Sequence, residues 1–156
     1  MGWMSESYVK YDTAKPSTPS EAGNPIVRDG QIHANNFCGA GIETDGIRGN
    51  NTKKAGIKVL QVALNHDYNA GLTVDGIRGA KTDAALGNHY VKYGETQYLV
   101  TAVEILLMLK GYNPGGVECP GQYGSGLKAA VTQYQRDHGL TADGVAGRNT
   151  ILSLIA

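Results

Sequence analysis

Residues 45–52 read DGIRGNNT, residues 75–82 read DGIRGAKT and residues 143–150 read DGVAGRNT. The three stretches share the pattern D-G-x-x-G-x-x-T, which we call the octad. A fourth stretch, PGQYGSGL at 120–127, keeps both glycines but lacks the Asp and the Thr. The four copies fall into two pairs along the chain. A pattern repeated in this way indicates a fold built from repeated units.

Each residue type in the octad has a physical role. The first glycine adopts a positive φ without steric cost, and the Asp carboxylate accepts hydrogen bonds from backbone amides one or two residues later. The second glycine permits close backbone approach before a helix, and the Thr hydroxyl bonds to the loop or to the Asp. Two interpretations of Asp45, Asp75 and Asp143 stay open. The three carboxylates stabilise their own loops through hydrogen bonds, or one of them contacts a ligand directly.

Each octad is expected to open an amphipathic helix, because apolar residues follow at steps of three and four. Ile57, Leu60 and Leu64 show this spacing after the first octad. Val131 and Tyr134 show it after the fourth. These two helices are expected to end at left-handed glycine caps, Gly71 and Gly139, and shorter helices are expected at 81–86 and 149–155.

A further helix is predicted at about 96–110, where apolar residues cover a wide face. So wide a face indicates a central, buried helix. Residues 24–42, by contrast, are rich in turn residues. We expect a loop with one short strand there and no helix.

Composition excludes several classes of function. The chain has 156 residues and a formal net charge of zero, which argues against nucleic-acid binding. The longest apolar run, within 99–109, falls short of the roughly 20 residues that a membrane span requires. The N-terminal residues MGWMSESYVK show no secretory signal pattern, so none is expected.

No pattern for catalysis, cofactor binding or metal binding is present in the sequence. There is no GxGxxG opening a helix, no P-loop, no zinc-spaced His pair and no calcium loop, and nothing selects a pair among the 14 acidic residues. Cys38 and Cys119 are expected to be unpaired thiols, with a single bridge between them as the alternative. No catalytic residue, cofactor or metal is therefore predicted.

The octads and the helices between them resemble the peptidoglycan-binding-like (PG_binding) family, a three-helix domain of bacterial and phage cell-wall hydrolases. The second unit matches from Thr96 to the end, and the first from about Thr44 to Gly87, without its leading helix. The resemblance implies an all-α fold of two tandem or fused units. We expect a flexible arm or linker at 1–37, a first unit at 38–92 and a second at 93–156.

The resemblance implies a non-catalytic module that binds Gram-positive peptidoglycan, through either the glycan or the stem peptide. The arrangement is similar to the C-terminal wall-binding half of phage endolysins, which carry an N-acetylmuramoyl-L-alanine amidase domain. The expected partners are then peptidoglycan and an N-terminal catalytic domain or full-length lysin, with no nucleic acid and no membrane. Such a protein is expected in the host cytoplasm until bacterial lysis and then at the cell wall.

Side chains that stack on sugars or form paired hydrogen bonds suit either wall ligand. The variable octad positions are expected to point outward, whereas Ile47, Ile77 and Val145 are expected to be buried. Tyr68, Tyr90, Tyr112 and Tyr134 either line a groove or are partly buried core residues with a solvated hydroxyl group. The predicted ligand-binding residues are Arg48, Arg78, Gln122, Tyr123, Tyr134, Asp75 and Asp143.

Two alternatives from other classes stay open. The first is a wall hydrolase that uses Cys38 or Cys119 as its nucleophile. The second is an assembly module, in which the apolar helix at 96–110 pairs with a partner chain, a full-length lysin or a second copy in a homo-oligomer.

Overall fold

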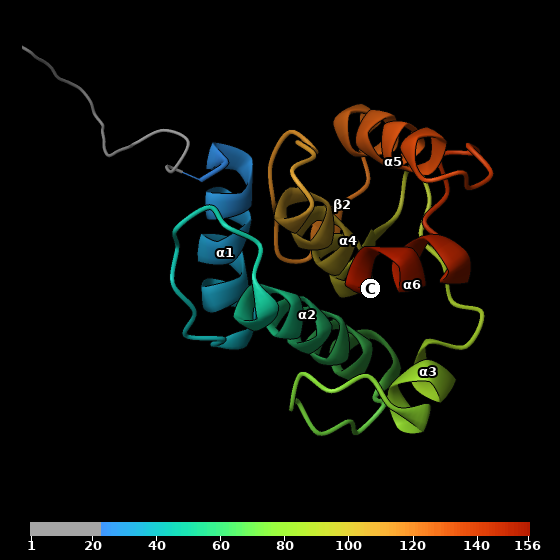
Figure 1. Cartoon of the computed structure of the whole chain (residues 1–156). Helices are drawn as coiled ribbons and strands as arrows, with labels where there is room; N and C mark the ends of the chain where they lie inside the picture. Colours follow the sequence, from blue (N-terminus) through green and yellow to red (C-terminus); the bar gives the residue numbers. More distant parts are fainter. Residues whose placement is uncertain (1–22) are drawn as a thin grey trace, which may run out of the picture.

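Helix α4 (Tyr98–Leu109) lies at the centre of the structure, with α1, α2, α5 and α6 around it (Figure 1). The computed structural model describes residues 23–156. Every residue of α4 from Leu99 to Leu109 is buried. The predicted central, buried helix is therefore confirmed. Its apolar face is already covered by helices of the same chain.

The described part of the chain is mostly helical, as the all-α prediction requires. Strands β1 (Thr96–Gln97) and β2 (Gly121–Gln122) form a small antiparallel pair next to α4. No helix in residues 23–156 is long and apolar enough to cross a membrane. The other helices are α1 (Pro25–Cys38), α2 (Asn50–Tyr68), α3 (Ala80–Leu86), α5 (Ser125–Asp137) and α6 (Arg148–Ile155).

Helix α1 was not expected, and the prediction that residues 24–42 contain no helix is wrong. The predicted flexible arm at 1–37 is wrong for Pro25–Phe37, which belong to α1, and its residues 1–22 lie outside the described residues. The residues that resemble turn signals have helical roles here. Asn24 is the N-cap, its side chain accepting from the Ile26 and Val27 amides, and Gly39 is the left-handed C-cap.

Gly30, in the middle of α1, is a packing residue and not a turn residue. A Cβ at this position would lie 2.9 Å from Cβ of Met108 and 3.0 Å from the Leu109 nitrogen. The missing side chain lets α1 approach α4 closely. Gly56 of α2 has a similar role, because a Cβ at this position would lie 3.0 Å from Cδ2 of Leu106. Both helices therefore pack tightly on α4.

The two predicted units share one hydrophobic core. It contains residues of α1 and α2 together with residues of α4, α5 and α6. A hydrogen-bonded cap also joins them: the Asp67 carboxylate, near the end of α2, accepts from the backbone amides of Tyr98 at 3.0 Å and Leu99 at 2.6 Å. A carboxylate at this position stabilises the positive end of the α4 dipole.

The short helices α3 and α6 begin within one residue of their predicted starts. The predicted caps agree less well. The C-cap of α2 is the left-handed Asn69, two residues before Gly71, whereas the C-cap of α5 is His138, with Gly139 following in the left-handed region.

Candidate functional site

A buried glutamine organises each of the three full octads. Gln31, Gln61 and Gln135 lie on α1, α2 and α5, and all three are buried. Each side chain bonds to the Asp, the first Gly and the Thr of the octad that follows it. We call this arrangement the glutamine knot.

The three glutamine knots have nearly the same geometry. In the second, Gln61 Nε2 lies 3.1 Å from Asp75 Oδ1, 3.1 Å from the Ile77 carbonyl oxygen and 3.2 Å from Thr82 Oγ1. The Gly76 amide donates to Gln61 Oε1 at 3.1 Å. The first and third knots repeat all four contacts. The glutamine precedes the Asp by 14 residues in two knots and by 8 in the third.

The knot explains the composition of the octad. Gly46, Gly76 and Gly144 have φ between 72° and 74°, a conformation that only glycine adopts readily. The Asp Oδ1 also accepts from the backbone amide two residues later, at 2.9 to 3.0 Å. These contacts favour the loop-tying interpretation of the Asp residues. In the second knot they lower the pKa of Asp75, through the Ile77 amide first and Gln61 second.

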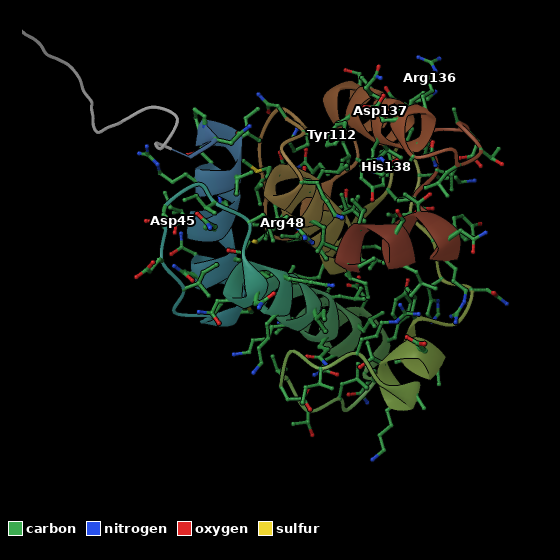
Figure 2. The ribbon with its side chains drawn as sticks, in the orientation of Figure 1. Asp45, Arg48, Tyr112, Arg136, Asp137 and His138 are labelled. Carbon is green, nitrogen blue, oxygen red and sulfur yellow. The ribbon has the colours of Figure 1, made fainter. Side chains whose placement is uncertain are left out.

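Four of the predicted ligand-binding residues are exposed: Arg78, Gln122, Asp75 and Asp143. Arg78 is paired with Asp83, with Nε 2.8 Å from Oδ1 and Nη2 3.2 Å from Oδ2. Arg48 is half-buried, and Figure 2 shows it directed toward the middle of the molecule, whereas Asp45 lies at the periphery near α1. Arg48 Nη2 is 3.3 Å from the Ala156 carbonyl oxygen, and burial lowers the pKa of the Arg48 guanidinium.

The expectation that Tyr123 points outward is wrong, and Tyr134, also predicted to bind a ligand, is a core residue. Tyr123 is 2% exposed and its hydroxyl donates to the Gly144 carbonyl oxygen at 2.6 Å, so its ring packs beneath the third octad. Tyr134 is 0% exposed, with its hydroxyl 2.7 Å from Ser153 Oγ. Both tyrosines are core residues because their hydroxyl groups find hydrogen-bond partners within the fold, which allows the apolar rings to be buried, and neither presents a ring to a surface ligand.

The expectation that Ile47 and Ile77 are buried is also wrong. They are 55% and 62% exposed. Their backbone carbonyl groups face the buried glutamines Gln31 and Gln61, which turns the side chains toward solvent. Val145 is half-buried.

Clefts lie beside the first and third octads, in equivalent positions of the repeat. The first has a volume of about 370 Å³ and is lined by Glu43, Asp45 and Asn51 among others. The third, of about 550 Å³, is lined by Asp143 and Asn149 at the octad positions of Asp45 and Asn51, by Thr141 two residues before the octad, as Glu43 is, and by Arg148. Both clefts are polar and carry charged side chains.

A pocket of a different character lies where α1, α2 and α4 meet. It has a volume of about 320 Å³, and we call it the aromatic pocket. The Tyr98 ring is stacked with His66, with centroids 4.4 Å apart and planes at 23°, and with Phe37 at 6.3 Å and 27°. The lining residues also include His33, Asn36 and Cys119. Sequence reasoning did not select any residue of this group as a ligand-binding residue.

The cysteines do not provide an activated nucleophile. Both are free thiols, which leaves no bridge between Cys38 and Cys119. Burial raises the pKa of both thiols, whereas a nucleophilic cysteine needs a lowered pKa. The aromatic pocket holds Cys119 near two histidines, but His66 there is stacked on Tyr98.

The remaining predicted groove tyrosines form packed clusters. Tyr112, which lies beside Asp137 in Figure 2, donates to Asp137 Oδ2 at 2.6 Å. It also meets Tyr134 edge to face, and Tyr134 stacks on His138. Tyr68 stacks on His89, with centroids 3.6 Å apart. Tyr90 is 49% exposed.

Residues 96–154 match the family model described as "Putative peptidoglycan binding domain". The matched segment runs from β1 into α6 and contains the third glutamine knot. The resemblance seen in the sequence is thereby confirmed for this segment. No curated protein matches the chain.

Proposed function

We propose that this protein is a non-catalytic peptidoglycan-binding module with two tandem units of related construction. The observation that carries the proposal is the match of residues 96–154 to a peptidoglycan binding domain. The first unit runs from α1 to α3 and includes the helix that sequence reasoning did not find.

The glutamine knot supports two related units. The knot of Gln135 lies inside the matched segment, and the knots of Gln31 and Gln61 repeat its contacts outside that segment. Four hydrogen bonds of one geometry, made by the same residue types, support a common construction for both parts of the chain. A two-unit module binds a polymeric ligand more tightly than one unit when both units engage it.

The module is proposed to bind the wall of Gram-positive bacteria and to hold a linked lytic enzyme there. A binding domain raises the local concentration of an attached enzyme at its substrate. The linked enzyme would be an endolysin or autolysin domain, such as an N-acetylmuramoyl-L-alanine amidase. A phage enzyme of this kind would stay in the host cytoplasm until lysis and then act at the wall.

The exposed residues of the predicted set stay candidates for ligand contact. Arg78, Gln122, Asp75 and Asp143 lie on the surface at or beside octads. Arg78 would have to give up part of its pairing with Asp83 to bind a ligand.

The two alternatives receive less support from the geometry. The hydrolase needs a thiolate, and the pKa of each thiol is raised. The assembly module needs a free apolar face on α4, and that helix is buried along its length.

The experiment that tests the proposal is a pull-down with washed Gram-positive cell walls, with and without wall teichoic acids and at several salt concentrations. Turbidity is followed in the same samples. We expect the chain to sediment with stripped peptidoglycan without loss of turbidity. Failure to sediment would contradict wall binding, and loss of turbidity would contradict a non-catalytic role.

A further inference from the structure

The aromatic pocket differs from the octad clefts in its charge. Its lining residues include no Asp, Glu, Lys or Arg. The octad clefts contain such residues, Asp45 and Glu43 in the first and Asp143 and Arg148 in the third. A pocket without these side chains favours a neutral ligand, because a charged ligand would lose part of its hydration without gaining a Lys, Arg, Asp or Glu partner.

Three rings that are stacked with nearly parallel planes form one wall of the pocket. Phe37, His66 and Tyr98 come from α1, α2 and α4, and neighbouring planes differ by only 23° to 27°. The Asp67 carboxylate, which caps α4 beside His66, fixes the position of Tyr98 relative to α2. The wall is therefore held by the packing of three helices and is formed before a ligand arrives.

The wall remains accessible to a ligand from solution. The side chains of His66 and Asn36 are exposed, and those of Phe37 and Tyr98 are half-buried. The amide of Asn36 can both donate and accept hydrogen bonds. A volume of about 320 Å³ is within the range of small-ligand sites.

We propose that the aromatic pocket binds an N-acetylated amino sugar of the glycan strand, with its ring against the exposed His66, which is stacked on Tyr98. The inference rests on the proposed function, since it decides between the two components of peptidoglycan. The stem peptide carries carboxylates, for which the pocket lining offers no Lys or Arg side chain. The sugar offers an apolar face to the aromatic rings and a neutral acetamido group to Asn36.

The test is a titration of the whole chain with chitotetraose, the tetramer of N-acetylglucosamine, followed by NMR. We expect the largest chemical-shift changes at Asn36, His66 and Tyr98. The His66→Ala variant should bind the tetramer at least fivefold more weakly. The matched control is His89→Ala, because His89 also stacks on a tyrosine, Tyr68, outside the pocket. Its affinity should stay within twofold of the wild-type value.

Three results would overturn the inference. They are an unchanged affinity in His66→Ala, shift changes confined to other surfaces, and pocket shifts produced by a free stem pentapeptide but not by chitotetraose. A parallel sedimentation with stripped peptidoglycan separates the two proposals. If the wild-type chain sediments but chitotetraose leaves the pocket signals unchanged, the sugar site is wrong and wall binding stands. If the chain does not sediment, wall binding is wrong, whatever the pocket signals show.

The Asn36→Ala variant provides a second measurement in which the stacked rings are retained. The Asn36 side chain is exposed, so its removal should leave the thermal unfolding temperature unchanged. We expect weaker binding of chitotetraose with the same set of shifted ring signals. Wild-type affinity in this variant would overturn the role assigned to the amide.

Discussion

The side-chain amide of Gln61 on α2 donates to the carboxylate of Asp75, 14 residues later, at a distance of 3.1 Å. The same glutamine also bonds to the Gly76 amide, the Ile77 carbonyl and the Thr82 hydroxyl. Its side chain therefore joins α2, the turn and the start of α3. Gln61 is 1% exposed, and its hydrogen bonds with the Gly76 amide and the Thr82 hydroxyl are buried, so solvent cannot readily replace them.

Replacing Gln61 with Ala should lower the free energy of unfolding by about 2 to 4 kcal/mol, because it leaves several buried polar groups without partners. The groups are the Gly76 amide, the Ile77 carbonyl and the Thr82 hydroxyl. Urea unfolding followed by circular dichroism measures the effect. The control is Gln133→Ala on the exposed face of α5, for which we expect a change below about 0.5 kcal/mol. Equal effects of the two substitutions would contradict the role of the glutamine knot.

Asp75 should make the fold sensitive to acid. Its pKa is lowered in the folded protein by the Ile77 amide and by Gln61, so its stabilising contribution is present above the unfolded pKa of about 3.9. That contribution is lost as the pH falls through the folded pKa. The Asp75→Asn variant should be less stable than wild type at neutral pH, with a difference that shrinks toward pH 2. Unfolding curves at a series of pH values test this, and a difference independent of pH would contradict it.

Glu104 should have the opposite pH dependence. The carboxyl is buried in α4, and burial, with Glu118 nearby, raises its pKa to about 9. Its contribution to stability is therefore fully present below the unfolded pKa of about 4.3 and is lost as the pH rises toward 9.

The Glu104→Gln variant removes this ionisation. We expect its free energy of unfolding at pH 8 to exceed that of wild type by at least about 1 kcal/mol, and to vary less between pH 5 and 9. Glu43→Gln, at an exposed position, is the control and should leave the pH profile unchanged. A Glu104→Gln variant that is less stable at pH 8 would show that the carboxyl is ionised and paired in the fold.

Gly30→Ala tests the close approach of α1 to α4. Alanine alone would favour the helix by about 1 kcal/mol. Its Cβ, however, would lie 2.9 Å from Cβ of Met108, and overpacking of this kind costs about 1 to 3 kcal/mol. We expect net destabilisation of about 1 kcal/mol in thermal or urea unfolding. The exposed neighbour substitution Asp29→Ala should be nearly neutral, and a stabilised Gly30→Ala variant would contradict tight packing there.

The sequence predicted those parts of the fold that depend on neighbouring residues. The apolar spacing within 96–110 predicted the buried helix α4, and the octads predicted where α3 and α6 begin. Helix α1 was missed because Asn24 and Gly30 act through capping and through contact with α4. Their local pattern, taken alone, is typical of a loop.

The glutamine knot has a signature in the sequence. Gln31 and Gln61 lie 30 residues apart, as do Asp45 and Asp75. Repeated spacing of a polar residue on an apolar helix face indicates a buried partner. The aromatic pocket had no such signal, because Phe37, His66 and Tyr98 are brought together only by the packing of three separate helices. Burial of Tyr123 and Tyr134 likewise depends on contacts distant in sequence.

The most direct measurement is a sedimentation isotherm of the purified 156-residue chain with peptidoglycan stripped of teichoic acids, together with an assay for released wall fragments. We predict saturable binding with no release of sugar or peptide. A chain that stays in the supernatant at all peptidoglycan concentrations, or that releases wall fragments, would contradict a non-catalytic peptidoglycan-binding function.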